Sequence, residues 1–437
     1  MKGAKKMKKI TVLSVALLAV GLAAFAETET SATIENVVVR QLWPWSGDVD
    51  IAFTVTGTKS TAVKFTAQYN GVEPYVIPES QLSGDFFDAA PGQHHVRWSP
   101  QRAGLDAKTL FNLKITAEPD DTDRTYLILN LYDGTYRYAS AEPEGGWLAD
   151  PANYQTNIVF RRVPKGTRNI GLTTEFDKKF NAANYAHKRE VTLTSDYYLS
   201  VFMTTEAQRK YIDGSDSNVS DEGKNYESRT YPQMRGGQED GIDWPSTEHM
   251  VKPGCIIDKL RNIVKSTFSS DWIVDLPTST QWEYAAKATT HFDELLSVGK
   301  IKVTDEDLYE KFTNNVDLVA VWHHNLHEWN DDRTTIGRRL KNGWGFYDMV
   351  GLGFEWCNDW YKNSYVDYSG VDPVGPTSDE VGDSKKRIRR SMYTHPPDAP
   401  GMIYYTTAYV GAFAPDGKNK CGYRFCINLK NMFKGKK

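Results

Sequence analysis

The sequence predicts an α+β protein made of an N-terminal all-β sandwich and a larger C-terminal domain with little regular secondary structure. Short β-branched and aromatic runs, separated by Gly and Pro, occupy residues 32–118, as in antiparallel sheets. From about residue 157 onward only two helix starts can be identified, and Gly, Asn, Asp and Trp dominate the long intervening segments. The length of 437 residues fits two or three domains of about 150 residues each.

Residues 1–26 have the features of a signal peptide. Five lysines precede an apolar run over residues 10–22, and Ala24-Phe25-Ala26 supplies the small residues of a cleavage site. The run is shorter than the about 20 residues that a membrane-spanning helix needs, and no later stretch is apolar enough to span. The first cysteine, Cys255, is far from the cleavage site, which argues against a lipid anchor. We expect export to the periplasm or the extracellular space.

Charge and cysteine content exclude two classes of protein. Loss of residues 1–26 changes the formal net charge from −4 to −9, because it removes five lysines and no acids. Nucleic acid binding depends on neutralising phosphates with Lys and Arg, so a nucleic acid partner is not expected. Four cysteines are too few for a disulfide-dependent scaffold, although Cys255 and Cys357 could pair in an oxidising compartment.

Residues 27–120 are predicted to form an immunoglobulin-like sandwich. Strands are expected at residues 34–39, 49–55, 62–69 and 111–117, and residues 49–55 alternate strictly between apolar and polar side chains. In this region Trp43-Pro44-Trp45 could form a carbohydrate platform. Packing of these rings in the core or against the second domain is the favoured interpretation.

Residues 121–157 are predicted to be a linker and an entry hairpin. An acidic stretch at 118–123 contains Pro119, and an apolar run at 126–131 has the composition of a strand. Beyond it, Thr205 with Gln208 and Thr278 with Gln281 each fit a capping box, in which the Thr hydroxyl and the Gln side chain satisfy unpaired N–H groups at a helix start.

The segment 158–432 carries a series of short motifs in a recognisable order. They are the strand 160–166, the segment 197–208, Asp243-Trp244-Pro245, the helix 276–286, Asn342-Gly343-Trp344-Gly345-Phe346-Tyr347-Asp348-Met349, Glu355-Trp356-Cys357-Asn358-Asp359-Trp360-Tyr361, and the segments 372–376, 389–391 and 422–424. Together they resemble the sulfatase-modifying factor (formylglycine-generating enzyme) family. The resemblance implies a C-type-lectin-like fold.

A structural calcium ion is also implied by this resemblance. In the family it is held at positions that match Asp348, Gly351, Gly353 and Glu355. Carboxylates and backbone carbonyls together suit Ca²⁺, which takes six to eight oxygen ligands. Leu352 stands where the family usually has Asn, which alters the hydrogen bonding expected in this loop.

The family enzyme oxidises a cysteine of a sulfatase peptide to formylglycine, using O₂ and a copper ion bound by two cysteines. Soft thiolates select Cu(I), so this chemistry requires the pair. The matching positions fall among residues 400–409, which contain no cysteine. Cys421 and Cys426 have the family spacing, but Gly422-Tyr423-Arg424 between them matches the terminal strand of the family. Residues five apart in a strand point to opposite faces about 17 Å apart, so they are weak candidates.

We therefore expect a non-catalytic, lectin-like binding protein whose partner is a carbohydrate or an extended peptide, for example of an exported sulfatase. The alternative is a copper-dependent oxidase that converts a sulfatase cysteine to formylglycine, with Cys421 and Cys426 as the Cu⁺ ligands. A further alternative is a cell-surface adhesion protein that binds through the sandwich. The predicted ligand cleft consists of Trp322, Tyr404, Tyr405 and Tyr409.

Overall fold

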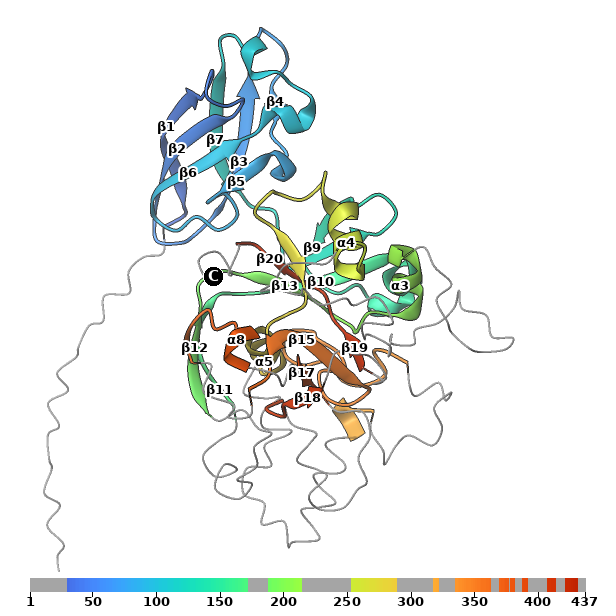
Figure 1. The fold of residues 1–437 in the computed structure, drawn as a ribbon. Coiled ribbons are helices and arrows are strands. Elements are labelled where there is room, and N and C mark those ends of the chain that lie inside the picture. The colour runs from blue at the N-terminus through green and yellow to red at the C-terminus, as the bar shows by residue number, and fades with distance from the viewer. Residues whose placement is uncertain are drawn as a thin grey trace, which may run out of the picture.

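Two β-rich parts lie one beyond the other in the computed structural model (Figure 1). The structure describes residues 30–171, 188–213, 253–288, 317–321, 335–362, 369–376, 378–381, 387–391, 407–413 and 421–430. The signal peptide predicted at residues 1–26 lies outside these ranges. Within them, no helix is both long and apolar enough to cross a membrane.

The N-terminal part consists of two antiparallel sheets, with strand orders β1-β2-β6-β5 and β4-β3-β7. Its elements are β1 (Thr33–Gln41), β2 (Val49–Thr56), β3 (Ala62–Gln68), β4 (Tyr75–Val76), η1 (Glu79–Gln81), β5 (Leu82–Gly84), β6 (Gly92–Trp98), η2 (Pro100–Ala103), η3 (Ala107–Thr109) and β7 (Lys114–Asp120). Along β2 every second side chain is buried, beginning with Val49, as the alternating sequence predicts. The strands predicted from the sequence are present.

The last strand of the N-terminal part includes the first acidic residues of the 118–123 stretch. Strand β7 continues to Asp120, with Pro119 opposite Val63 and Asp120 opposite Ala62. A proline is tolerated here because β7 is the outer strand of its sheet, where no further neighbour needs its missing N–H. The stretch 118–120 is therefore strand, and β7 ends at residue 120, where the sandwich was predicted to end.

The C-terminal part contains three further sheets, with orders β14-β20-β13-β10-β8-β9, β11-β12-β16 and β18-β17-β15-β19. Its first elements are β8 (Tyr126–Asn130), β9 (Tyr136–Ala139), η4 (Trp147–Ala149), α1 (Ala152–Gln155), β10 (Asn157–Val163), β11 (Gly166–Ile170), β12 (Arg189–Leu193), β13 (Tyr197–Ser200), α3 (Glu206–Asp213) and α4 (Ile256–Val264). They are followed by β14 (Ile273–Asp275), α5 (Ser279–Ala286), β15 (Phe354–Trp360), β16 (Gly370–Val371), α8 (Ser378–Val381), β17 (Arg387–Arg390), β18 (Gly411–Phe413), β19 (Cys421–Tyr423) and β20 (Cys426–Asn428). The predicted entry hairpin is β8–β9, and both strands belong to the six-stranded sheet.

Both predicted capping boxes are present. Thr205 Oγ1 accepts from Gln208 N at 3.1 Å while Gln208 Oε1 accepts from Thr205 N at 2.9 Å, at the start of α3. The same reciprocal pair joins Thr278 and Gln281 at the start of α5. These local contacts explain why the two helix starts could be identified from sequence alone.

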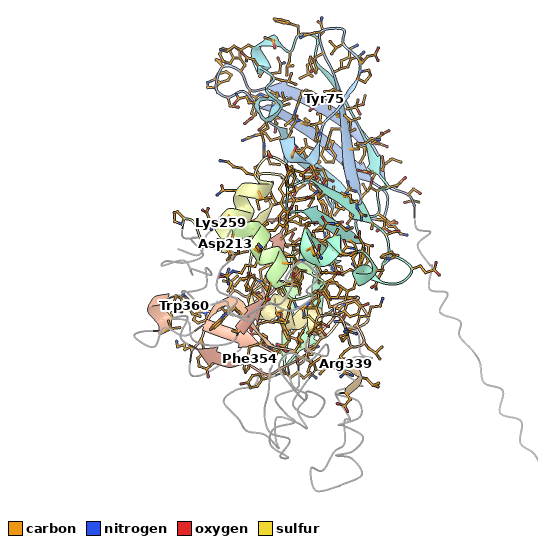
Figure 2. All side chains as sticks on the ribbon, turned by 90° about the vertical axis from the view of Figure 1, so that its right-hand side faces the viewer. Tyr75, Asp213, Lys259, Arg339, Phe354 and Trp360 are labelled. Carbon is orange, nitrogen blue, oxygen red and sulfur yellow. The ribbon has the colours of Figure 1, made fainter. Side chains whose placement is uncertain are left out.

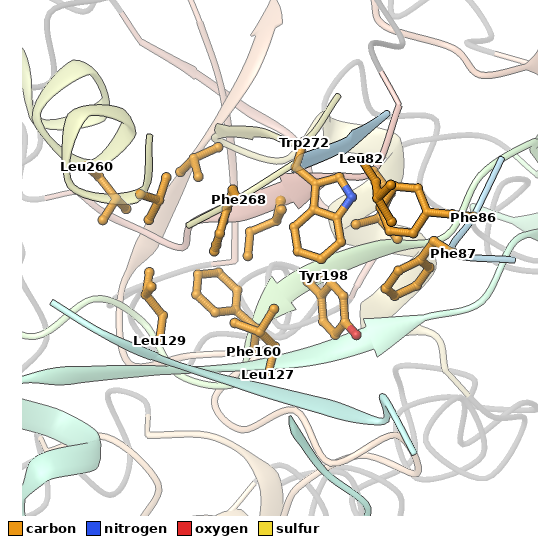
Figure 3. Packing of buried hydrophobic residues seen from close by; sticks show 14 of the residues in the cluster. Leu82, Phe86, Phe87, Leu127, Leu129, Phe160, Tyr198, Leu260, Phe268 and Trp272 are labelled. Carbon is orange, nitrogen blue, oxygen red and sulfur yellow. The ribbon is translucent and has the colours of Figure 1, made fainter. Parts of the chain in front are cut away.

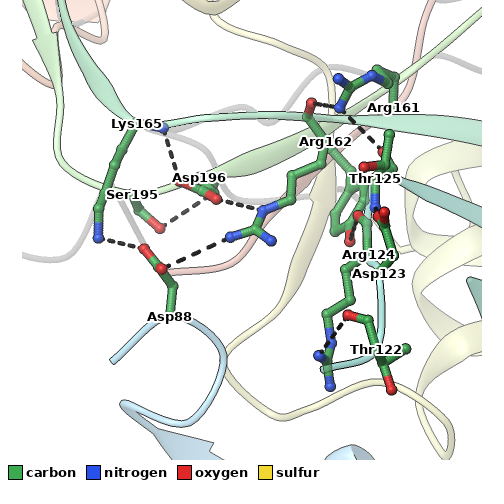
Figure 4. A network of polar contacts seen from close by, with 11 residues as sticks. Asp88, Thr122, Asp123, Arg124, Thr125, Arg161, Arg162, Lys165, Ser195 and Asp196 are labelled. Carbon is green, nitrogen blue, oxygen red and sulfur yellow. Dashed lines mark hydrogen bonds and ion pairs between the residues drawn. The ribbon is translucent and has the colours of Figure 1, made fainter. Parts of the chain in front are cut away.

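One hydrophobic cluster extends through both parts of the chain. Phe87 packs edge to face on Tyr198 and Trp272, with ring centroids 6.2 and 5.5 Å apart, and Figure 3 shows these rings together. Polar contacts lie beside them: Asp88 pairs with Lys165 and with Arg162, as Figure 4 shows. The two parts share a core, so apolar burial stabilises their mutual orientation.

Glu79 of η1 is the centre of a second contact between the parts. Its Oε1 accepts from Nε and Nη2 of Arg124 at 3.1 and 2.8 Å. Its Oε2 accepts from the hydroxyls of Tyr136 and Tyr138 at 2.8 and 2.6 Å. Arg124 Nη2 also donates to Asp120 at 2.6 Å. Removal of Glu79 would leave a buried guanidinium and two phenols without their common acceptor.

We expect Glu79→Ala to lower the free energy of unfolding by about 1.5–3 kcal/mol, because it removes the charged acceptor shared by Arg124, Tyr136 and Tyr138. The matched control is Glu118→Ala, whose carboxylate pairs with Lys64 on the surface. That variant should lose less than about 1 kcal/mol. Equilibrium urea unfolding of the mature chain measures both, and equal losses would contradict the structural role of Glu79.

Candidate functional site

The segment that carries the longest sequence motif begins with a turn organised by Asn342. Its Oδ1 accepts from Trp344 N at 3.0 Å and from Phe346 N at 3.1 Å. Its Nδ2 donates to Ala285 O at 2.9 Å, a carbonyl at the C-terminal end of α5. The side chain thus closes the turn and satisfies a helix-end carbonyl, which places the following residues and β15 against α5.

Glu355 in β15 forms a fully buried ion pair with Arg424. Arg424 Nε lies 2.9 and 2.8 Å from the two carboxylate oxygens, and Trp282 Nε1 donates to Oε2 at 2.7 Å. The remaining guanidinium nitrogens donate to the carbonyls of Val201 and Tyr347 at 2.7 and 2.6 Å. Both oxygens of Glu355 therefore have hydrogen-bond partners, and a guanidinium already neutralises its charge.

Asp348 differs from Glu355 in having one oxygen without a partner among the described residues. It is buried, with a φ of 55°, and its Oδ2 accepts from Gly337 N at 2.7 Å. No partner is found for Oδ1. Burial raises the pKa of Asp348 to about 6, because water no longer stabilises the charged carboxylate.

The two predicted glycine ligands belong to a tight turn. Gly351 has a φ of 78°, and a Cβ atom there would lie 2.4 Å from the carbonyl oxygen of Val321, so only glycine fits. Its carbonyl accepts from Ser391 Oγ at 3.0 Å and from Gly353 N at 2.7 Å. This carbonyl is already engaged by protein donors.

The two carboxylates predicted to bind calcium have different surroundings in this arrangement. Of the two predicted carboxylates, only Asp348 has an oxygen without a donor among the described residues, whereas Glu355 faces a cation that would repel Ca²⁺. Among the described residues no three His, Cys, Asp or Glu side chains gather as a metal site would require. Calcium binding stays a prediction, and the ion pair with Arg424 is the interaction present.

A second buried charge cluster anchors the chain on either side of the predicted cleft. Glu283 of α5 accepts from Arg189 and Arg390 at 3.0 and 2.9 Å. Arg390 Nη1 also donates to the carbonyls of Thr407 and Tyr409 at 3.1 and 3.3 Å. Burial alone would raise the pKa of Glu283, but the two guanidinium groups outweigh it and hold the pKa below its ordinary value.

Of the predicted cleft residues, only Tyr409 belongs to the described part of the chain. It is buried, and Arg390 holds its backbone. Trp322, Tyr404 and Tyr405 lie outside the described residues. The described residues that flank the 392–406 segment are Ser391 and Thr407, and both are buried.

All four cysteines lie in the described residues, where they are buried and form no disulfide. Cys421 is in β19, beside β15, and belongs to the cluster that continues into the N-terminal part. Cys426 is in β20, between β13 and β14 in the six-stranded sheet, and belongs to another cluster. Burial raises the pKa of the Cys426 and Cys357 thiols well above their ordinary value. Cys421 and Cys426 therefore do not fit a shared copper ion, which needs two adjacent thiolates.

Sequence reasoning named Arg390 and Arg424 only as parts of motifs and did not predict their roles. Both are fully buried. One feature of the sequence could have indicated their roles. Each arginine lies in a short strand-like run with residues that are buried, and an arginine is rare in such a run unless it is paired. The carboxylate partners, 107 and 69 residues away in sequence, could not be identified from spacing.

Comparisons with known proteins agree with the sequence motifs. The profile of the family described as "Sulfatase-modifying factor enzyme 1-like domain" matches residues 149–391. Chaperone protein LppX of Paenibacillus barcinonensis is 26% identical over 201 residues, which cover 42% of this chain and 69% of that protein. Serine/threonine-protein kinase pkn1 of Chlamydia pneumoniae is 28% identical over 114 residues, which cover 26% of this chain and only 15% of the kinase. No solved structure matches.

Because Arg424 already neutralises Glu355, we expect the melting temperature to change by less than about 1 °C on adding excess EDTA or millimolar calcium. An ion bound at a hundredfold excess over its Kd would add about 2.7 kcal/mol, which corresponds to several degrees. Differential scanning fluorimetry of the mature chain measures this. A calcium-dependent rise that Asp348→Asn abolishes would show that the predicted site forms after all.

Glu283→Gln should destabilise the protein in a pH-dependent way. At neutral pH it removes the buried carboxylate that pairs with two buried guanidinium groups, at a cost of about 3–5 kcal/mol. The folded-state pKa of Glu283 is depressed, so its contribution is present above about pH 4.5 and is lost as the pH falls through the folded pKa. Urea unfolding at a series of pH values should show the deficit shrinking below pH 4.5. A constant deficit would mean that packing, and not charge, stabilises this cluster.

Proposed function

Since the chain belongs to the Sulfatase-modifying factor enzyme 1-like domain family, we propose that it is an exported binding protein that uses the family framework without the family's oxidation chemistry. The family domain has the C-type-lectin-like fold, and the N-terminal sheets form an immunoglobulin-like sandwich. Export depends on the signal peptide at residues 1–26. Fold membership does not carry the activity, because the site residues decide it.

The position of the thiols is the observation that carries this proposal. Copper-dependent oxidation needs two thiolates on one metal ion. Cys421 and Cys426 belong to strands of different sheets and to different hydrophobic clusters. Burial also favours the protonated form of Cys426, which cannot serve as a thiolate ligand without losing that proton. No step of the oxidation is therefore assigned to these residues.

The ligand region that we propose is bounded by Ser391 and Thr407. Ser391 Oγ donates to Gly351 O, and Arg390 Nη1 donates to the carbonyls of Thr407 and Tyr409. Glu283 in turn accepts from Arg390 and neutralises its charge. These hydrogen bonds fix Ser391 and Thr407, the residues that flank the proposed ligand-binding segment. Fixed ends lower the conformational entropy that the segment loses on binding. The aromatic residues of this cleft suit a carbohydrate or an extended peptide. Similarity to a protein named a chaperone favours the peptide.

The competing function is a formylglycine-generating oxidase, which family membership itself favours. To separate the two, the mature chain is loaded with Cu(I) under oxygen and given a sulfatase-type peptide that contains the target cysteine. A matched peptide carries serine instead. We expect mass spectrometry to find no conversion to formylglycine, and fluorescence anisotropy to find similar binding of both peptides if the ligand is a peptide.

Conversion of the cysteine peptide, abolished in Cys426→Ser, would establish the oxidase and overturn the proposal. Binding of neither peptide, with retention by a glycan array that persists in Trp45→Ala, would assign the cleft to carbohydrate and keep the protein non-catalytic. An absence of both binding and conversion would also contradict a binding function at this cleft.

A further inference from the structure

Three loops meet at one end of the N-terminal sheets, and we call their exposed surface the tip. They are residues 42–48 between β1 and β2, residues 69–74 between β3 and β4, and residues 105–112 before β7. Gln41 Nε2 donates to Leu110 O at 2.8 Å, which joins the first loop to the third. Asn70 joins the second loop to the third, because its Oδ1 accepts from Phe111 N at 2.7 Å and its Nδ2 donates to Thr109 O at 2.5 Å.

Large apolar side chains at the tip project into solvent. Trp45 is 84% exposed, Phe111 66%, Trp43 49% and Val72 46%. The sequence interpretation, in which Trp43 and Trp45 pack in the core or against the second domain, is therefore wrong. The β1–β2 loop extends beyond the sheets, so its rings have no partner layer to cover them. An exposed cluster of this kind marks an interaction site, because its hydration is costly unless a partner covers it.

The first loop is held in shape by its own hydrogen bonds. Leu42 N donates to Asp48 O at 3.0 Å, and Leu42 O accepts from Trp45 N and Ser46 N at 2.9 and 3.0 Å. Lys108 of the third loop places its Nζ 4.5 Å from the centre of the Trp43 ring. The backbone that presents the two indoles is thus ordered without a ligand, and Lys108 restricts the Trp43 ring. Preorganisation lowers the entropic cost of binding.

The tip is also separate from the family domain. The 69–74 loop leads directly into β4, whose Tyr75 lies in the upper part of Figure 2, whereas Phe354 of β15 and Arg339 lie at the other end of the molecule. A ligand at the tip would therefore lie at the end of the molecule away from β15 and from β17, its neighbour in the sheet.

We propose that the tip binds a neutral polysaccharide, with the exposed indole of Trp45 stacked on the apolar face of a sugar ring and Trp43 beside it. Sugar rings present C–H groups on one face and hydroxyl groups around the edge. The indoles can stack on the face that presents C–H groups. The exposed carboxylates of Glu73 and Asp106 can accept hydrogen bonds from the hydroxyl groups.

Charge argues against an anionic membrane as the occupant. The three loops carry the carboxylates of Asp48, Glu73 and Asp106 and only one cation, Lys108. Binding to anionic lipid depends on clusters of Lys and Arg next to the apolar side chains. Size argues against a folded protein, because a stable interface buries about 800 Å² on each partner and involves roughly 20–30 residues per side. Four apolar side chains on loop ends match a few sugar units.

Affinity electrophoresis of the mature chain tests the proposal, in gels cast with hydroxyethylcellulose, mixed-linkage β-glucan, xylan or α-mannan. We expect retardation by at least one polysaccharide, with the apparent Kd raised about tenfold or more in Trp45→Ala. The matched control is Tyr132→Ala, which removes an aromatic ring that is 80% exposed in the β8–β9 turn of the C-terminal part. This control should be retarded like the parent protein.

Because Trp45 is mostly in solvent, its replacement should leave the melting temperature unchanged, and the peptide binding of the family domain as well. Failure of the proposed cleft and failure of the tip are therefore distinguishable. Retardation by none of the four polysaccharides, or equal retardation of Trp45→Ala, would overturn the proposal. Sedimentation with phosphatidylcholine vesicles, or dimerisation in light scattering, that is lost in Trp45→Ala would overturn it by assigning the tip to lipid or to a second copy of the chain.

Discussion

The buried ion pair between Glu355 and Arg424 is the interaction on which the C-terminal part depends. Arg424 lies between β19 and β20, which belong to different sheets, and its guanidinium reaches the carboxylate on β15 and the carbonyls at the end of β13. Trp282 of α5 binds the same carboxylate. Burying two charges costs several kcal/mol, and the pair persists because each is paired and hydrogen-bonded. One helix and strands of two sheets are thereby fixed to one another.

The second charge cluster extends this framework toward the proposed ligand region. Glu283 lies on the same helix as Trp282, and through Arg390 it positions the backbone of Thr407 and Tyr409. A domain with so much irregular chain can order its loops by buried guanidinium groups that bind backbone carbonyls.

The framework of the family domain is separate from its chemistry, so the fold does not by itself decide the activity. The glycine turn at Gly351, the Asn342 turn and the capping box of α5 are all intact, and each is required by backbone geometry or by unsatisfied N–H and C=O groups. None of these features requires cysteine at positions 400–409. The N-terminal part is likewise joined to this framework, through Phe87 and Glu79, and it carries its exposed loops at the opposite end.

The sequence by itself determined what depends on neighbouring residues. Both capping boxes, the alternating strand at Val49 and the order of family motifs could be predicted, because local hydrogen bonds and side-chain periodicity produce them. Only the tertiary structure decided what depends on distant residues. The pairing of Glu355 with Arg424, 69 residues away, is of this kind, and so is the position of β7 at the edge of its sheet, which accommodates Pro119. Trp45 looked like a core residue because hydrophobicity predicts burial on average, but whether a ring is covered depends on which element folds over it.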